Sequence, residues 1–257
     1  MVNIGTCKLC GQEKELIGKS HIIPRHFYHK TTQEIENHFN DVSQGDKVPR
    51  LFSADYKSRQ AQSGLYVPDI LCTDCENFLG RWDNYAQNFL LKEVNINPLG
   101  NNDYTIQQVN SFDYKQLKLF CMSVLWRSHI SRDKAFGSFK FFSEVNLGTV
   151  WENILRNLLL KEDPSDEDTF SVAIFILTGI EAQSVIPPSP RRYHSVNSYR
   201  FRMGNYGFLI KVDRRKFSEG TRKFILKPNQ PLKLYVQQYT KNNDYQYVLK
   251  GLNNYQN

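Results

Sequence analysis

The sequence predicts an α+β protein with a cysteine-paired N-terminal unit, a helical middle and a β-rich C-terminal part. Two C-x-x-C pairs lie in the first third of the chain. Apolar residues recur at helical spacing in the middle, and short β-rich runs follow residue 169. Because the helices precede the strands instead of alternating with them, an α+β architecture is favoured over α/β. We expect a unit at 1–95, a helical region at 104–161 and a β-rich region at 169–257, the last two packed as one second domain.

Apolar periodicity predicts two helices, at about 74–92 and about 113–130. The first has the stripe Cys75, Phe78, Leu79, Trp82, Tyr85 and Phe89. Thr73 and Glu76 have the spacing of a capping box at its start, and Thr149 and Glu152 repeat that spacing before another apolar run. Cys121, on the stripe of the second helix, is expected to be a small core residue.

The C-terminal third is predicted to form strands. They are FSVAIFILTG, YRFRMGNYGFLIKVD with a hairpin through Gly204–Gly207, RKFILKP and LKLYVQQYT, with a turn at Asn242–Asn243. Loops are expected at Asn95–Tyr104 and Lys161–Thr169. VIPPSPRR (Val185–Arg192) is predicted to be irregular, because proline lacks the N–H donor and fixes φ.

The composition is that of a globular protein, with 17 Phe, 14 Tyr and 3 Trp. The N-terminus does not resemble a signal peptide, and the apolar run Val172–Leu177 is too short to span a bilayer. We therefore expect a cytoplasmic protein that makes no membrane contact. Residues 187–227 carry 11 basic and 2 acidic side chains, a net charge of +9 against +7 for the whole chain. This asymmetry indicates a surface that faces a polyanion, although a solvated basic face would have the same composition.

Four of the five cysteines form the pairs Cys7/Cys10 and Cys72/Cys75. In a chain without a secretory signal, paired C-x-x-C motifs indicate metal binding before disulfides. Two such pairs match a tetrahedral four-cysteine zinc site of the treble-clef type, in which the second pair opens a helix. Four unrelated thiols are the alternative. With four thiolate ligands the zinc would be structural, because no coordination position stays open.

The segments around these cysteines resemble the HNH endonucleases, which have a ββα-metal core and often a four-cysteine zinc knuckle. The resemblance covers about residues 5–90 and is carried by Cys7, Cys10, Ser20, His21, Pro24, Cys72, Cys75 and Glu76–Asn77. The chain is also similar to uncharacterised bacterial HNH-like proteins in which SHIIP and LCxxCE segments precede an LWR element. Here that element is Leu125–Trp126–Arg127.

The resemblance implies that His21 is the general base that deprotonates water for attack on a phosphodiester, beside one Mg²⁺ or Mn²⁺. Ser20 stands where the family has an acidic or imidazole ligand, and Glu76 stands where it often has histidine. Asn77 or Asp69 could assist the cation. Two alternatives stay open: Glu76 as a capping-box partner of Thr73, and His21 as a packed histidine in a catalytically degenerate site. His26, His29 and His38 could also supply a ligand.

A nucleic-acid surface is expected from basic residues in both parts of the chain. Arg25 and Arg59 could contact phosphate, with a surface salt bridge as the alternative. In the C-terminal part the candidates are Arg191, Arg192, Arg200, Arg202, Arg214, Arg215 and Lys216. Strand alternation in YRFRM would expose Arg200 and Arg202 and turn Tyr199, Phe201 and Met203 towards the core.

The sequence thus favours an HNH-type endonuclease that acts on DNA rather than RNA. A catalytically degenerate zinc protein that binds nucleic acid is the second hypothesis. The third is a component of a bacterial defence or mobile-element system, in which the basic face meets a protein partner.

Overall fold

A computed structural model describes residues 3–27, 50–52, 58–60, 66–100, 102–131, 145–178 and 184–238, with only the backbone described for 50–52, 58–60 and 184. His29, His38 and the turn expected at Asn242–Asn243 lie outside the described residues. Arg59 falls on a strand whose side chains are not described. Within the described residues, no helix has the length and apolar character needed to cross a bilayer.

One eight-stranded sheet, in the order β5-β4-β9-β10-β11-β8-β12-β7, forms the centre of the fold. Its strands are antiparallel except for the pairs β12–β8 and β4–β9. The bounds are β4 Arg50–Phe52, β5 Ser58–Gln60, β7 Tyr104–Val109, β8 Val172–Thr178, β9 Ser184–Tyr193, β10 Val196–Gly204, β11 Tyr206–Lys211 and β12 Leu232–Gln238. The two edges, β5 and β7, come from the parts of the chain expected to form the N-terminal unit and the helical region. One sheet therefore joins all three predicted regions.

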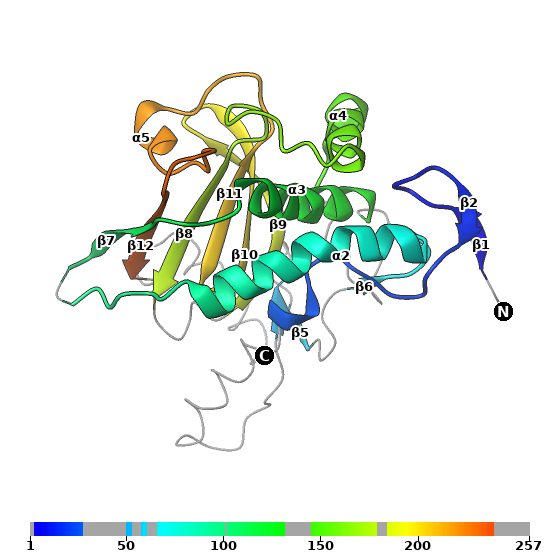
Figure 1. The fold of residues 1–257 in the computed structure, drawn as a ribbon, viewed down its shortest axis with the longest axis horizontal. Coiled ribbons are helices and arrows are strands. Elements are labelled where there is room, and N and C mark those ends of the chain that lie inside the picture. The colour runs from blue at the N-terminus through cyan, green and yellow to red at the C-terminus, as the bar shows by residue number, and fades with distance from the viewer. Residues whose placement is uncertain are drawn as a thin grey trace, which may run out of the picture.

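The helix α3 (Tyr114–Ile130) lies against one face of this sheet, and α2 (Thr73–Asn88) and α4 (Gly148–Leu160) pack on α3 (Figure 1). A π-helical turn, η1 (Phe89–Glu93), extends α2. The helices predicted at 74–92 and 113–130 are thus confirmed. Every residue from Leu117 to Ser128 is buried, because α3 is enclosed by its neighbours on all sides. Cys121 is among them, as expected.

Neither predicted capping box forms. α2 begins at Thr73 with Cys72 as its N-cap residue, and α4 begins at Gly148 with Leu147 in that position; neither cap makes a side-chain hydrogen bond. Thr73 already lies inside the first turn, so its hydroxyl is not in the N-cap position. Glu152 instead accepts a hydrogen bond from Trp126 Nε1 on α3 at 3.0 Å.

The predicted strand segments are confirmed in part. β8, β12 and the β10–β11 hairpin form as expected, and the hairpin turns at Gly204, whose φ is +59°. RKFILKP does not form a full strand: a short helix, α5 (Glu219–Arg222), enters it and only Ile225 bridges to the sheet. VIPPSPRR is not irregular but belongs to β9. Pro187 and Pro188 are accommodated where the β9–β10 register shifts, a position that needs no ladder donor.

Both faces of the sheet are covered, which corrects the expected exposure of β10. Tyr199, Phe201 and Met203 point into the main core, as the alternation predicted. The other face carries a second cluster of Ala173, Val196, Leu209, Phe217 and Ile225. Arg202 is consequently buried, at 1% exposure, and Arg200 is half-buried with its guanidinium 4.6 Å from the centre of the Phe175 ring. The prediction of an exposed Arg200–Arg202 stripe is therefore wrong.

Candidate metal centre and the His21 segment

The four paired cysteines converge at the N-terminal end of the molecule. Cys7 and Cys10 lie at the turn between β1 (Ile4–Thr6) and β2 (Glu13–Glu15), while Cys72 and Cys75 lie at the start of α2. Gly11, at φ +74°, closes the turn with a hydrogen bond from its N–H to Cys7 O at 2.9 Å. The four Sγ atoms all lie within 4.8 Å of one another. The prediction that these cysteines form one cluster is confirmed.

The electrostatics of the cluster fit a bound cation. Burial opposes ionisation of Cys7, but backbone N–H groups of Cys10, Cys72 and Leu9 outweigh it and lower the Cys7 pKa to about 7. Burial raises the pKa of Cys72 and of Cys75. Four thiolates together in this pocket therefore need a compensating positive charge. Tetrahedral zinc suits the observed spacing, because a Zn–S bond of about 2.3 Å places neighbouring sulfur atoms ~3.8 Å apart.

The turn that carries Cys7 and Cys10 is fixed to the rest of the fold. Lys8 N donates to Ile70 O at 2.9 Å, and Arg156 Nε of α4 donates to Leu9 O at 2.7 Å. Lys14 pairs with Asp74 at the start of α2 across 2.9 Å, but both side chains are exposed and this pair contributes little. A metal here would join the N-terminal hairpin to α2, next to α4.

His21 lies on a two-stranded antiparallel sheet that precedes α2 in the chain. β3 (Ser20–His21) pairs with β6 (Tyr66–Val67) through Ser20↔Val67 and His21↔Tyr66. Ser20 is fully buried, whereas His21 is half-buried. The Tyr66 ring meets the imidazole edge-on, with 6.1 Å between the ring centres. The imidazole thus lies at the surface of the fold, on a backbone set by strand pairing.

Glu76 connects α2 to this sheet. Its carboxylate accepts a hydrogen bond from Ser20 Oγ at 2.6 Å and a longer one from His21 N at 3.4 Å. Satisfying the hydroxyl matters, because an unpaired polar group costs free energy once it is removed from water. The contact of Glu76 is therefore with β3 and not with a helix cap.

Arg127 secures the opposite side of the His21 main chain. Its Nη1 donates to His21 O at 2.8 Å, and its guanidinium makes two hydrogen bonds to the Asp83 carboxylate of α2, at 2.9 and 2.7 Å. The Arg127 side chain is 1% exposed and that of Asp83 14%. Asp83 was not identified from the sequence. Its spacing of seven residues from Glu76, which places both on one face of α2, is a signal that could have identified it.

The remaining residues predicted around His21 are not gathered into a second cluster. Asn77 is exposed and points about 100° around α2 from Glu76, and Arg25 is exposed after β3. Asp69 is half-buried at φ +62°, with its N–H bonded to Ile17 O. Within the described residues, the four cysteines are the only group of three or more His, Cys, Asp or Glu side chains placed to hold a metal.

The basic segment is partly neutralised by its own neighbours. Arg215 pairs with Asp213, and Lys216 pairs with Asp168 at 2.7 Å. Arg191, Arg192 and Arg214 are exposed, and Arg202 is buried. These three arginines are exposed, and neither of the two ion pairs just described involves them. Of the seven residues predicted in this part, they are therefore the best placed to contact a polyanion.

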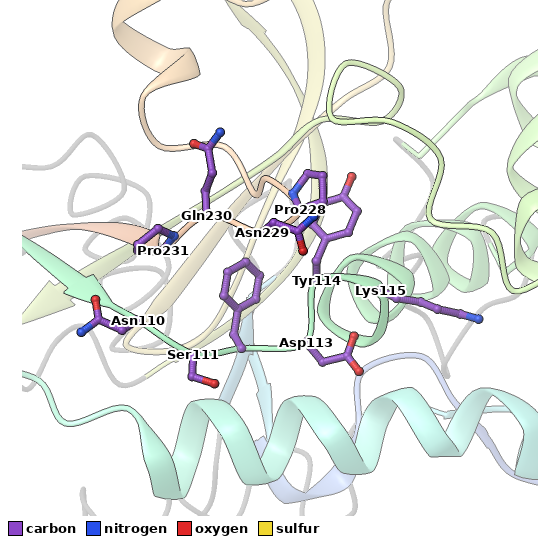
Figure 2. Close-up of a pocket in the computed structure, with 10 residues that line it drawn as sticks. Asn110, Ser111, Asp113, Tyr114, Lys115, Pro228, Asn229, Gln230 and Pro231 are labelled. Atoms are coloured by element: carbon purple, nitrogen blue, oxygen red, sulfur yellow. The ribbon is translucent and has the colours of Figure 1, made fainter.

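A separate pocket of about 550 Å³ lies where the loop before α3 meets the loop before β12. Figure 2 shows Asp113 from the first loop and Tyr114 from the start of α3 opposite Pro228–Pro231 from the second loop, with the Lys115 side chain pointing away. None of the predicted catalytic or metal-binding residues lines it. The Asp113 carboxylate is already used as the N-cap of α3, where it accepts from Gln116 N at 2.9 Å. The candidate site is therefore the cysteine cluster with the His21 segment.

No family model matches this chain, and neither do any curated proteins or solved structures.

Proposed function

We propose that the protein is a metal-dependent HNH-type endonuclease that hydrolyses phosphodiester bonds in DNA. The observation that carries the proposal is a pair of hydrogen bonds to the His21 main chain. The His21 N–H donates to Glu76, and the His21 oxygen accepts from Arg127. This histidine lies on a two-stranded sheet followed by a helix that opens at the cysteine cluster. The order strand, strand, helix is the one that the resemblance implied.

In this proposal the His21 imidazole is the general base. Imidazole is suited to general-base catalysis near neutral pH, and His21 is half-buried, so the residue keeps contact with solvent. It would take a proton from the water that attacks phosphorus. The fixed backbone would limit the movement of the ring relative to the substrate, which favours a productive geometry.

A catalytic Mg²⁺ or Mn²⁺ would offset the charge that develops on the phosphate. Glu76 is the carboxylate that contacts the Ser20–His21 segment and is the best-placed ligand; Asn77 is the neighbouring candidate. Ser20 is fully buried and already donates to Glu76, so it would orient that carboxylate rather than contact a hydrated ion. Zinc on the four cysteines would be structural.

The basic surface would hold the DNA backbone. Arg191, Arg192 and Arg214 are exposed, and guanidinium groups bind phosphate in a two-pronged geometry. Binding through such contacts falls steeply with salt, because each contact releases counterions.

A second candidate function is a catalytically degenerate zinc protein of the same architecture, which binds nucleic acid or a protein partner in a bacterial defence or mobile-element system. The contacts of Glu76 favour it. Its carboxylate is engaged by Ser20 Oγ and His21 N, which leaves fewer free lone pairs for a cation.

Incubation of supercoiled plasmid with Mn²⁺ or Mg²⁺ tests the proposal. We expect nicking by the wild type and by His26→Ala, an exposed histidine five positions further on, and none by His21→Ala. Intact plasmid with all three proteins, together with retained DNA binding, would favour the degenerate alternative.

A further inference from the structure

The tip of the β9–β10 hairpin has an unusual backbone. Tyr193 and Val196 form the last pair of the ladder, so His194 and Ser195 make a two-residue turn. Both have positive φ, +45° and +66°. Such turns normally use Asn or Gly, because a Cβ at positive φ costs free energy. The backbone of His194 and Ser195 is thus strained at the end of the hairpin, next to Tyr193.

Tyr193 presents an aromatic ring at this tip. It is 43% exposed, although it is a large aromatic side chain. The His194 ring meets it edge-on at 4.5 Å between ring centres, and the buried Phe217 ring lies 6.5 Å away, almost perpendicular. The Tyr193 ring therefore contacts two neighbouring rings while the residue stays 43% exposed.

Three exposed arginines belong to the same end of the sheet as Tyr193. Arg191 and Arg192 precede it on β9, and both are exposed. The turn that follows β11 brings in Arg214, because Asn197 N bonds to Asp213 Oδ2 at 2.9 Å and Val212 N to Asn197 O at 2.9 Å. The carboxylate of Asp213 is only 7% exposed and pairs with Arg215, so it does not cancel the charge of the other arginines.

We infer that this tip, Arg191–Ser195 with Arg214, binds DNA that contains unpaired bases. A base would stack on Tyr193 while the arginines contact the adjoining phosphates. Bases inside a duplex are already stacked and paired, so they reach such a ring only after they are flipped out. This inference rests on the nucleic-acid part of the proposed function and deepens it by naming single-stranded or locally unpaired DNA as the substrate class.

The tip is distinct from the His21 segment. Phe217 precedes α5, and Figure 1 shows α5 at the opposite end of the view from β6, the strand that pairs with His21. The tip would therefore position a strand and take no part in bond cleavage.

Fluorescence anisotropy tests the inference with a labelled strand of about 20 nucleotides, longer than typical single-strand sites of ~4–16 nucleotides. The strand is compared with its full duplex at one fixed, moderate salt concentration. The variants are Tyr193→Ala, Tyr193→Phe and, as control, Tyr104→Ala. Tyr104 is 55% exposed, against 43% for Tyr193, and lies on the edge strand β7.

We expect the wild type to bind the single strand more tightly than the duplex. Tyr193→Ala should weaken single-strand binding by about 5- to 150-fold, because a stacked base contributes that much, and should leave duplex binding nearly unchanged. Tyr193→Phe and Tyr104→Ala should bind as the wild type does.

Two results overturn the inference. If wild type and Tyr193→Ala bind the single strand with equal affinity, the tip does not bind unpaired bases, and the nuclease proposal is unaffected. Absence of binding to either DNA removes the inference and the DNA-binding part of the proposed function together. Single-strand preference without plasmid nicking would remove the nuclease activity alone.

Discussion

Arg127 of α3 donates a hydrogen bond to the main-chain oxygen of His21 across 2.8 Å, between residues 106 positions apart in the chain. The same guanidinium makes a two-pronged pair with Asp83 of α2. One buried cation thus joins both helices to the strand that carries the candidate base. The position of His21 consequently depends on the packing of the helical layer and not only on the pairing of β3 with β6.

Loss of this guanidinium should destabilise the fold. Arg127→Met leaves the Asp83 carboxylate without its cation, and we expect a fall of about 3–5 kcal/mol in the free energy of unfolding. Arg81→Met removes an exposed pair with Glu162 and should cost under about 1 kcal/mol. Urea denaturation of both variants measures the difference. Equal midpoints would contradict the role assigned to Arg127.

The hydrogen bond from Ser20 to Glu76 predicts that Glu76→Ala and Thr73→Ala differ in stability, whereas a capping box would predict a cost for both. Glu76→Ala should cost about 1–3 kcal/mol, because it leaves a fully buried hydroxyl without an acceptor. Thr73→Ala should be nearly neutral, because that hydroxyl does not cap α2. Thermal unfolding compares the two. A cost for Thr73→Ala as large as that for Glu76→Ala would restore the capping-box interpretation.

The cysteine cluster predicts about one zinc per chain in protein purified without chelator. Cys10→Ser should lose most of it, whereas Cys121→Ala should retain it, because Cys121 lies buried on α3 outside the cluster. Elemental analysis measures the metal, and hydrogen exchange should show loss of protection in the β1–β2 hairpin and at the start of α2. Full zinc in Cys10→Ser would contradict the assignment.

The lowered pKa of Lys118 predicts that the free energy of unfolding rises at alkaline pH. Burial lowers its pKa from 10.5 to about 8 in the folded protein, where Nζ contacts Tyr114 Oη at 3.0 Å. Between these two values the unfolded chain holds a proton that the folded chain has released. The free energy of unfolding of the wild type should therefore increase with pH over this window.

The contribution of Lys118 is measured by comparing the wild type with Lys118→Met. Relative to Lys118→Met, the wild type should gain about 2 kcal/mol between pH 8 and pH 10, at ~1.4 kcal/mol per pH unit where the lysine titrates fully. Lys115→Met, on an exposed position of the same helix, should show no such slope. A pH-independent difference for Lys118→Met would mean that Lys118 stays protonated in the folded state.

Local patterns predicted the elements whose causes are local. The stripes of α2 and α3 and the two C-x-x-C pairs are short-range signals, and the structure confirms the helices and the cysteine cluster. The two capping boxes failed because Glu76 and Glu152 meet Ser20 and Trp126, partners far away in sequence. Spacing alone does not distinguish a cap from such a contact.

The sheet was harder to predict for the same reason. Alternation assigned the two sides of β10 correctly but could not indicate that both sides are covered, so Arg202 appeared exposed. β7 is short and half polar, as suits an edge strand, and was not recognised. Asp83 belongs to the candidate site through its contact with Arg127. Its spacing from Glu76 places both residues on one face of α2, but that spacing does not reveal the partner on α3.

The most direct measurement is the rate of Mn²⁺-dependent plasmid hydrolysis by wild type and His21→Gln, in preparations matched for zinc content and melting temperature. We expect the wild type to nick the plasmid and the variant to lose at least about 100-fold in rate, the usual minimum for removal of a general base. Equal rates for the two proteins, or no hydrolysis by either, would contradict a catalytic role for His21.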